Sequence, residues 1–425
     1  MGDVFEFADE LGPLKVIHVH EPAVGLRAVL VVDNLAAGPS IGGVRMAPDV
    51  STAECCRLAR AMTLKNAAAG LPHGGGKAVL YGDPKMPKAR KEVLIRALAK
   101  ALRNEDTYIF APDMGTGEEC MAWVRDEIAR VVALPREIGG IPLDEIGATG
   151  FGLSQVAEVA LEYCDFELRG ARVVVQGFGA VGRHAARFLT ARGALLVGAA
   201  DSTGTIHNSR GLDVERLTEI KGQGGSVGDY ADASKMDRDA VVDIDCDIWI
   251  PAARPDVIDA HNVERLRARL VIEGANIPIT HEAERILAGK GVLCVPDFIA
   301  NAGGVICAAM EYRGASESAA LESIEEKLRR NTRQTLEQAG RRKILPRQAA
   351  VEAELAGADA AGTTGREQVV EVRRQGRHRL TRVREHAQYA ARRRISGARH
   401  EALGDELASR DRTRMVSVKL RRIPV

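Results

Sequence analysis

The sequence has few aromatic residues and no long hydrophobic run. Phe, Trp and Tyr make up 4% of its 425 residues against 45% apolar residues, so we expect cores rich in Ala, Val and Leu. No run of 18 apolar residues occurs, and we therefore expect no membrane-spanning helix. The N-terminal residues include Asp3, Glu6 and Asp9 and no apolar segment, which is not typical of a secretory signal peptide.

The seven cysteines lack the spacing of a disulfide scaffold or of a metal site. No two of them form a C-x-x-C pair. Small secreted domains are dense in disulfides, whereas thiols stay reduced inside cells. We therefore predict a cytoplasmic protein with no bound metal.

The segment Met62–Lys77 holds two lysines in places where a charge needs a partner. A possible capping box at Ser51 and Glu54 begins a helix, and apolar residues at helical spacing lead to Lys65, which should point inward with them. Lys77 follows three glycines, which we expect to form a loop whose backbone can approach a ligand closely. Two buried or pocket-facing ammonium groups need an anion or a chemical role. The alternative is a pair of surface lysines beside a flexible turn.

These glycines do not form a phosphate-binding P-loop. That motif requires G-x-x-x-x-G-K-[ST]. Leu71 stands at the position of the first glycine, and Ala78 at the position of the hydroxyl residue.

Residues 172–182 predict a dinucleotide-binding turn. A β-branched run leads into Gly-x-Gly-x-x-Gly, a helix-compatible segment follows to about Arg192, and a second apolar run over 194–200 ends in Asp201. In this context the pyrophosphate lies on a helix N-terminus and the acidic residue binds a ribose hydroxyl. Because Asp201 would repel a 2′-phosphate and Ser202 and Thr203 supply no cation, we favour NAD over NADP. The alternative is a tight turn without a ligand.

Further strand-like runs occur at 247–250, 270–272 and 292–295. Each is followed by a polar or glycine-containing loop, over 251–254, 273–276 and 296–304. Ligands of open α/β sheets bind at the carboxyl ends of strands, so these loops are the expected cofactor and substrate edge.

The motifs together make the chain similar to the glutamate/leucine/phenylalanine/valine dehydrogenases, from about Gly38 to about Ala350. The segments that carry the resemblance are Gly42–Met46, Met62–Lys77, Ala111–Thr116, Ala148–Gly152, Gln176–Gly182, Glu273–Asn276 and Asn301–Gly304.

The resemblance implies an α/β fold with two domains and a cleft between them. We expect a substrate-binding and oligomerisation domain over 1–145, a Rossmann dinucleotide-binding domain over 146–325, a helix returning to the first domain over 326–350, and an atypical basic tail over 351–425. It also implies reversible oxidative deamination of an L-amino acid to a 2-oxo acid and ammonia with NAD or NADP, in a homo-hexamer or homo-octamer.

The resemblance also assigns roles to residues. Lys65 matches the lysine that binds the substrate carboxylate, Lys77 the catalytic lysine, and Asp113 the aspartate that exchanges a proton with the amino nitrogen. The expected substrate-binding residues are Ile41, Gly43, Met62, Lys65, Asn301 and Ala308. The expected cofactor-binding residues are Thr149, Gly177, Phe178, Gly179, Ala180, Val181, Gly182, Asp201, Ala252 and Asn276.

The chemistry agrees with these roles. A lysine with its usual pKa of about 10.4 is a poor base. Burial and a second nearby cation, for which we expect Lys65, should lower the pKa of Lys77. Asp113 then provides a separate acid/base group for the substrate nitrogen.

Two positions predict the substrate side chain. Glutamate-specific members carry a lysine just before the first Gly-Gly and a serine seven positions after the asparagine of Asn-Ala-Gly-Gly, but this chain has Ile41 and Ala308 there. A buried second carboxylate would lack its partner, so we favour Leu, Val or Phe side chains, with glutamate as the alternative. Two rival functions are a nucleotide-binding protein without turnover and a 2-hydroxy-acid dehydrogenase. The second would need a His/carboxylate pair, and the sequence does not place His73 or His184 in one.

The C-terminal segment differs from the family. Residues 347–425 carry 18 Lys and Arg against 10 Asp and Glu, a net charge of +8, and show no sustained helical or strand period. A nucleic-acid-binding arm, a natural disordered extension and a segment outside the ancestral reading frame are the three interpretations. We favour the last, expect the segment to be largely disordered, and do not expect nucleic-acid binding.

Overall fold

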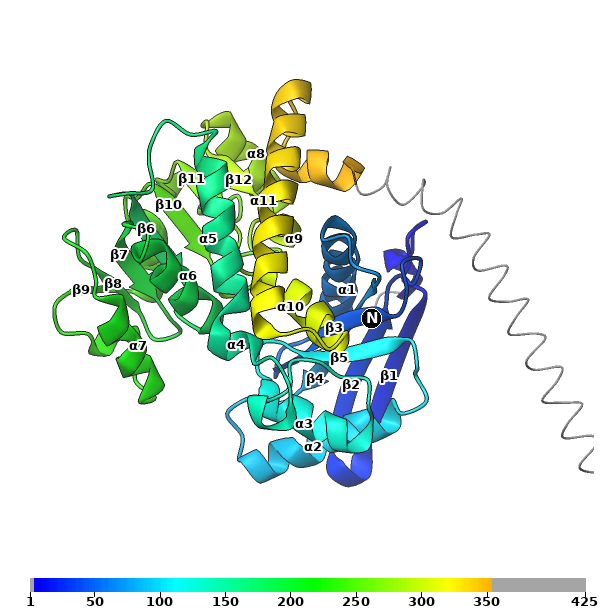
Figure 1. Cartoon of the computed structure of the whole chain (residues 1–425). Helices are drawn as coiled ribbons and strands as arrows, with labels where there is room; N and C mark the ends of the chain where they lie inside the picture. The colour runs from blue at the N-terminus through cyan, green and yellow to red at the C-terminus, as the bar shows by residue number, and fades with distance from the viewer. Residues whose placement is uncertain (1–3, 354–425) are drawn as a thin grey trace, which may run out of the picture. The chain divides into compact units, whose positions relative to one another are not determined.

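The computed structural model describes residues 4–353 of the chain. The predicted tail, its proposed disorder and its origin therefore lie almost entirely outside the described residues. Two β-sheets organise the described part, each covered by helices (Figure 1). No helix of this part is long and apolar enough to cross a bilayer. The described residues also contain no group of three or more His, Cys, Asp or Glu residues that could hold a metal ion.

The first sheet has five strands in the order β1-β2-β4-β3-β5. These are β1 (Lys15–Glu21), β2 (Leu26–Val32), β3 (Ser40–Ala47), β4 (Gly74–Tyr81) and β5 (Tyr108–Pro112). Strand β3 runs parallel to β4 and β5, whereas β2 is antiparallel to β1 and β4. Its helices are α1 (Thr52–Ala68), α2 (Lys88–Ala101) and α3 (Glu118–Glu127). Helices α2 and α3 bury their apolar side chains on one face of the sheet, and α1 packs on the other.

The second sheet has seven strands in the order β12-β11-β10-β6-β7-β8-β9. These are β6 (Arg172–Gln176), β7 (Leu195–Ala200), β8 (Thr205–His207), β9 (Ser234–Met236), β10 (Ile248–Pro251), β11 (Leu270–Ile272) and β12 (Leu293–Val295). The five strands from β12 to β7 are parallel, and β8 and β9 are antiparallel additions. Parallel strands covered on both faces are expected to be continuous apolar runs, which is how they were found in the sequence. The strands predicted near 172–175, 194–200, 247–250, 270–272 and 292–295 are confirmed.

The remaining helices connect and cover this sheet. They are α4 (Leu143–Ile146), α5 (Ala148–Leu161), α6 (Ala180–Thr190), α7 (Val214–Gly222), α8 (His281–Gly289), α9 (Asp297–Ala300), α10 (Gly303–Tyr312) and α11 (Glu317–Arg342). Short 3₁₀ turns occur at η1 (Val4–Phe7), η2 (Pro22–Val24), η3 (Arg136–Ile138), η4 (Val227–Asp229), η5 (Arg238–Asp243) and η6 (Val263–Arg265).

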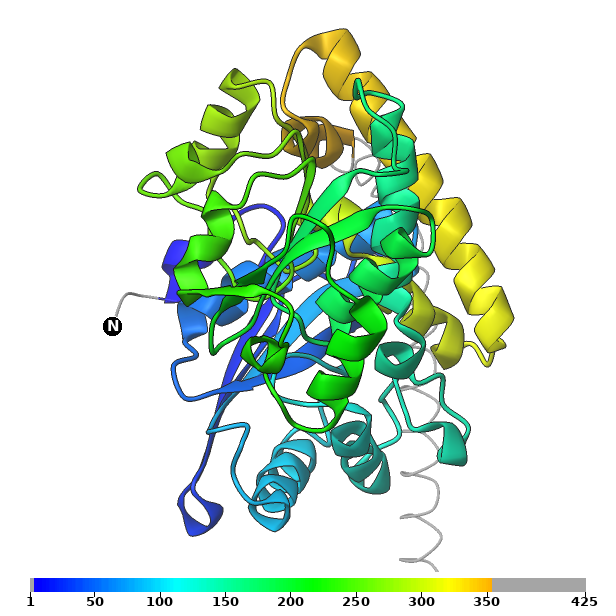
Figure 2. The ribbon, with the colours of Figure 1, turned by 90° about the vertical axis from the view of Figure 1, so that its left-hand side faces the viewer.

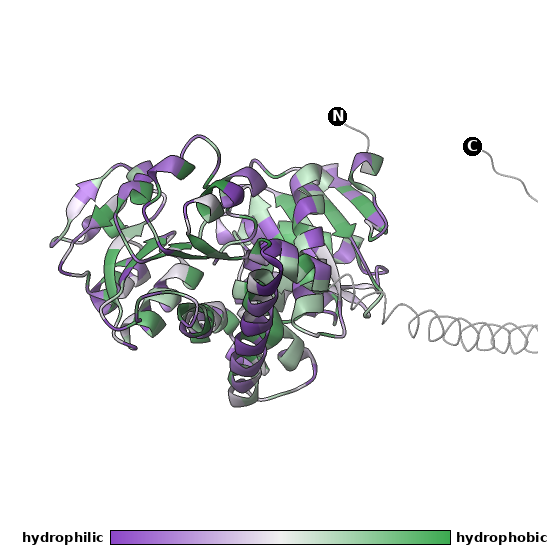
Figure 3. Cartoon of the chain, turned by 90° about the horizontal axis from the view of Figure 1, so that it is seen from above, coloured by the Kyte–Doolittle hydropathy of each residue, from purple (hydrophilic) through white to green (hydrophobic). Residues whose placement is uncertain are grey.

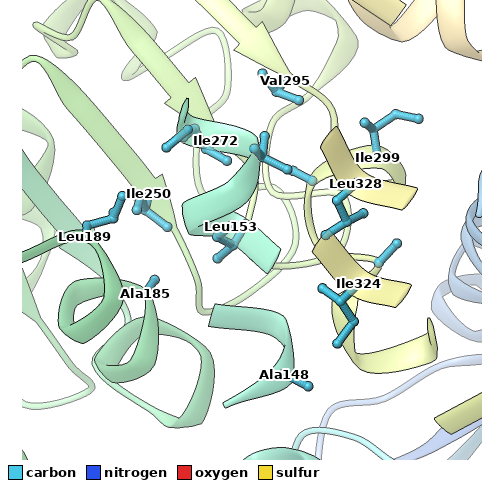
Figure 4. Close-up of a cluster of buried hydrophobic side chains, with 14 of the residues drawn as sticks. Ala148, Leu153, Ala185, Leu189, Ile250, Ile272, Val295, Ile299, Ile324 and Leu328 are labelled. Carbon is cyan, nitrogen blue, oxygen red and sulfur yellow. The ribbon is translucent and has the colours of Figure 1, made fainter. Parts of the chain in front are cut away.

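The main core joins one face of the second sheet to these helices. In Figure 4, Leu153 of α5, Ala185 and Leu189 of α6, and Ile324 and Leu328 of α11 surround side chains from the sheet strands. Most of these side chains are aliphatic, as the low aromatic content predicts. Strands are the most hydrophobic elements, while the helices carry mixed surfaces (Figure 3).

The returning helix differs from the prediction over 326–350. Helix α11 already begins at Glu317, runs beside α5 (Figure 2), and ends at Arg342. Lys343 then adopts a left-handed conformation with φ 56°, a common way for a helix to end, and Pro346 begins a second helical segment over 346–353. The sequence therefore predicted one element where the chain has two.

Candidate active site

A cavity of about 1050 Å³ is lined by residues of both sheets and their loops. All the residues predicted for the site line it except Gly182. Among the described residues, no histidine lines this cavity. The arrangement of the lining therefore matches the dehydrogenase prediction and gives no support to a histidine-based 2-hydroxy-acid mechanism.

Lys65 points inward from α1, as the spacing predicted. It is 6% exposed, and its Nζ donates a hydrogen bond of 2.8 Å to Oδ1 of Asn276, on the loop after β11. Burial lowers the pKa of Lys65 to about 8, although the charge of Asp297 opposes the shift. Only half of the predicted capping box is present. Ser51 accepts from the backbone N–H of Glu54, but the Glu54 carboxylate bonds to Arg45 instead of returning to Ser51.

Lys77, Asp113 and Arg45 form a charged cluster, with Lys77 in the middle of β4, Asp113 directly after β5 and Arg45 near the end of β3. Lys77 forms an ion pair with Oδ2 of Asp113, and Nη2 of Arg45 lies 3.6 Å from Oδ1 of the same carboxylate. Burial lowers the pKa of Lys77, Asp113 opposes this, and Arg45 adds to it. Burial alone would raise the pKa of Asp113, but Lys77 and Arg45 outweigh it and lower that pKa.

Arg45 is the main cation that lowers the pKa of Lys77, whereas the sequence prediction named only Lys65, whose charge also repels that of Lys77. Lys65 is affected by Lys77, but its main partners are Asn276 and Asp297. Arg45 was present in the motif Gly42–Met46, yet nothing local in the sequence shows that its guanidinium turns toward Asp113.

The three glycines before Lys77 do not form a loop, which is a second correction. They are the buried start of β4. A Cβ on Gly75 would lie 2.1 Å from the backbone N of Thr63 in α1, so the glycine allows the helix to approach the strand. The glycines place Lys77 by packing, and not by holding a ligand.

The pocket beside these charges is apolar at the two positions that predicted specificity. Ile41 is 0% exposed and Ala308 2% exposed, and both line the cavity. Gly43 and Met62 lie on the same lining. Asn301 is 5% exposed, and its Nδ2 donates to the carbonyl of Ala275 at 2.9 Å.

The loop after β6 has the geometry of a dinucleotide-binding turn. Gly177 has φ 99°, a conformation that favours glycine, and its position leads directly to the N-terminus of α6. A Cβ on Gly182 would lie 2.1 Å from the carbonyl oxygen of Gly177, so this glycine serves the packing of helix on turn. No atom lies within 4 Å of a Cβ built on Gly179, which leaves open space at the helix N-terminus for a pyrophosphate. The residues present therefore fit a dinucleotide.

The strand order places this loop at a topological switch point. The chain passes from β6 to β7 on one side, whereas β10 lies on the other side of β6. The loop after β10 contains Ala252, whose backbone N–H donates a hydrogen bond of 2.7 Å to the backbone carbonyl of Gln176 at the end of β6. Thr149, at the start of α5, completes this part of the lining. Ligands of such sheets bind at this point.

Asp201 has a partner that the sequence did not reveal. Lys221 of α7 donates to Oδ2 of Asp201 at 2.7 Å, and Val227 and Thr203 donate further hydrogen bonds to the same carboxylate. Burial alone would raise the pKa of Asp201, but these donors outweigh burial and lower the pKa to about 2. Ser202 and Thr203 supply no cation, as expected, but Lys221 does, because it lies 20 residues away in sequence and folds back through α7.

The two halves of the cleft also contact each other at its rim. Arg57 of α1 makes a bidentate ion pair of 3.0 Å with Asp256, in the loop after β10. Arg254, in the same loop, lies 3.5 Å from Asp49. With the Lys65–Asn276 hydrogen bond, these contacts join the lysine-bearing side of the cleft to the nucleotide side.

Comparison with known protein families agrees with this geometry. Residues 139–365 match the family model described as glutamate/leucine/phenylalanine/valine dehydrogenase, and residues 13–130 match its dimerisation domain. The chain belongs to the Glu/Leu/Phe/Val dehydrogenase family. It is therefore an NAD(P)-dependent amino acid dehydrogenase, and the family resemblance found in the sequence is confirmed.

Three relatives illustrate how far the similarity to other members of the Glu/Leu/Phe/Val dehydrogenase family extends. The glutamate dehydrogenase of Aeropyrum pernix is 38% identical over 319 residues, which are 71% of this chain and 76% of that protein. The NADP-specific glutamate dehydrogenase of Saccharolobus shibatae is 37% identical over 66% of this chain and 69% of its own length. The hetero-hexameric glutamate dehydrogenase of Thermus thermophilus, solved in a Leu-bound form, has a TM-score of 0.75 and 29% identity, and the match covers 82% of this chain and 89% of that one.

Proposed function

We propose that this cleft carries out the reversible oxidative deamination of an L-amino acid, with Lys65, Lys77 and Asp113 as its working residues. The observation that carries the proposal is their placement. Three charged groups that are expensive to bury line one cavity with the dinucleotide turn. Charges in such a place are typical of an active site rather than of a structural core.

Lys65 is proposed to bind the substrate α-carboxylate. Its ammonium has only the neutral Asn276 oxygen as a hydrogen-bond partner among the described residues. A carboxylate arriving in the cavity would supply the missing anion and form a charge-assisted hydrogen bond. Binding should therefore require the protonated form of Lys65.

Lys77 and Asp113 are proposed to handle the protons. A bound nicotinamide dinucleotide would accept the hydride from the substrate Cα. Lys77, with its lowered pKa, then takes a proton from the water that attacks the iminium carbon of the substrate. Asp113, which is ionised in the resting enzyme, transiently accepts a proton from the substrate amino group and returns it to the departing nitrogen. Arg45 holds the Asp113 carboxylate in place.

For the cofactor we propose that both NAD and NADP are accepted. The sequence favoured NAD because of Asp201, but Lys221 offsets that charge in the structure. Lys221, Arg238 and Arg265 line the same cavity, which supports tolerance of a 2′-phosphate. One of the relatives is named as NADP-specific, which supports the same view.

For the substrate side chain, the comparisons support glutamate better than the apolar side chain expected from the sequence. Each of the three relatives is a glutamate dehydrogenase. We therefore propose L-glutamate as the first candidate. One observation favours a second candidate, an apolar amino acid. Ile41 and Ala308 place no charge or hydroxyl where a side-chain carboxylate would need one.

A single assay tests the function and separates the two candidates. Formation of reduced cofactor would be followed by ultraviolet absorbance with Glu, Leu, Val and Phe, each with NAD and with NADP. Turnover with none of these amino acids would refute the proposed function. A higher kcat/KM for glutamate than for the three others would establish the first candidate, and the reverse order the second.

We also propose that the active form is an oligomer of identical or mixed subunits. The match to a dimerisation domain over residues 13–130 supports association, and the Thermus thermophilus relative is a hetero-hexamer. Light scattering coupled to size-exclusion chromatography measures the mass. A monomer at working concentration would refute this proposal.

A further inference from the structure

Arg347 is the centre of a buried charged cluster outside the residues assigned so far. It lies in the helical segment over 346–353, which follows α11 (orange in Figure 1). Its Nη2 contacts both oxygens of Glu273 at 2.9 and 2.8 Å, its Nη1 lies 2.8 Å from Asp297, and its Nε lies 2.8 Å from Glu284. The side chain of Arg347 is 12% exposed, and those of the three carboxylates are at most 1% exposed.

Stability alone does not explain such a cluster. Burying ions requires their desolvation, and well-packed apolar residues often stabilise a fold as well or better. One guanidinium faces three carboxylates, and burial raises the pKa of Glu273 to about 8 in spite of Arg347. The cluster is therefore costly, which directs attention to what else its members hold.

Two of the three carboxylates hold backbone groups of the active-site loops. Asp297 accepts a hydrogen bond of 2.8 Å from the backbone N–H of Ile277, directly after Asn276. Glu273 accepts one of 3.2 Å from the N–H of Asp297, at the start of the turn that leads to Asn301. Arg347 thus ties the loop after β11 to the start of α9, because it holds both carboxylates in one fork-shaped guanidinium.

These loops contact Lys65 of α1 through the side chain of Asn276. Asn301 donates to the carbonyls of Gly274 and Ala275, at 3.3 and 2.9 Å, and so fixes the course of the first loop. Asn276, which follows Ala275 in that loop, accepts the hydrogen bond from Lys65. The path from Arg347 to the lysine ammonium therefore consists of one carboxylate, one backbone segment and one side-chain amide.

We propose that Arg347 is a positioning residue for substrate binding, which acts through Glu273 and Asp297 on Asn276 and Lys65. The proposal rests on the proposed function, in which Lys65 binds the substrate carboxylate. Arg347 touches neither substrate nor cofactor in this scheme. Its removal should loosen the two loops, so substrate binding should suffer more than the chemical step.

The test compares three variants of the full-length chain. Arg347→Met removes the charge, Arg347→Lys keeps the charge without the fork, and Glu284→Gln is the matched control, because Glu284 lies on α8 and holds no active-site loop. For Arg347→Met we expect KM for the amino acid to rise at least about tenfold while kcat changes less, the scale of a displaced binding group. The KM of Arg347→Lys should lie between those of Arg347→Met and the wild type. Glu284→Gln should leave KM within about twofold of the wild type.

A second readout does not depend on activity. Hydrogen exchange of peptides that cover residues 273–301 should be faster in both Arg347 variants than in the wild type and the control. If Arg347→Met does not fold, Arg347→Lys decides the outcome by the same two measurements. An unchanged KM, a KM rise without faster exchange, or an equal KM rise in Glu284→Gln would overturn the proposal.

The two proposals fail separately. A wild-type chain that turns over no amino acid refutes the proposed function. In that case hydrogen exchange of residues 273–301 in the Arg347 variants still tests whether Arg347 holds the two loops. An active wild type with normal kinetics and normal exchange in the Arg347 variants refutes only the positioning role.

Discussion

Replacing Lys77 separates the chemical role of this lysine from its contribution to stability. Lys77→Met keeps most of the side-chain volume and removes the amine. Because a positioned general base contributes about 10²–10⁴ in rate, we expect kcat to fall by that factor, equivalent to about 3–5 kcal/mol of transition-state stabilisation. Cofactor binding should persist, because the dinucleotide turn lies on the other sheet.

The structure also sets the expected change in stability. Lys77 is 2% exposed and pairs with Asp113, so its removal leaves a buried carboxylate with a weaker partner. Arg45 remains 3.6 Å from that carboxylate. We therefore expect the free energy of unfolding to fall by about 1–3 kcal/mol, less than for a carboxylate left with no cation. In Lys77→Met/Asp113→Asn most of this loss should be recovered, since the uncompensated charge is gone.

The assay measures kcat, cofactor affinity and urea unfolding for Lys77→Met, the double variant and Lys100→Met. Lys100 is a surface lysine of α2, 58% exposed, and its replacement should change none of the three quantities. A near-normal kcat in Lys77→Met, or a kcat that returns with stability in the double variant, would refute the reasoning.

Four further changes test contacts of the same cleft and the C-terminal segment. Ile41→Lys should raise kcat/KM for glutamate relative to leucine at least about tenfold, because it supplies a cation for a second carboxylate, whereas Ile41→Met should not. Lys221→Ala should weaken NADPH binding more than NADH binding, since Asp201 is left uncompensated and repels a 2′-phosphate; equal weakening would contradict this. The Kd of the 2-oxo acid product, which has no amino group, should rise as pH passes about 8, because Lys65 loses its proton there, and a Kd that is flat from pH 7 to 9 would contradict the assigned role. Cutting the chain after Ala353 should leave cofactor binding unchanged and lower the free energy of unfolding by no more than about 1 kcal/mol, because every assigned residue precedes the cut; loss of folding would contradict it.

The sequence by itself determined the elements whose information is local. The apolar runs of the second sheet, the Gly-x-Gly-x-x-Gly turn and the inward face of α1 each follow from the order of neighbouring residues, and all are present in the structure. The returning helix is an exception. It was predicted as one helix over 326–350, although Pro346, three residues after Lys343, marks a break in the sequence.

Only the tertiary structure decided which charges meet. Arg45 beside Asp113, Lys221 beside Asp201, and Arg347 among carboxylates far from it in sequence are contacts between separate elements. The same holds for the glycines before Lys77, which resemble a loop in the sequence but are a strand because α1 and β3 pack against them. A side chain's charge is written in the sequence, but its pKa and its partner depend on burial and on distances that only the folded chain sets.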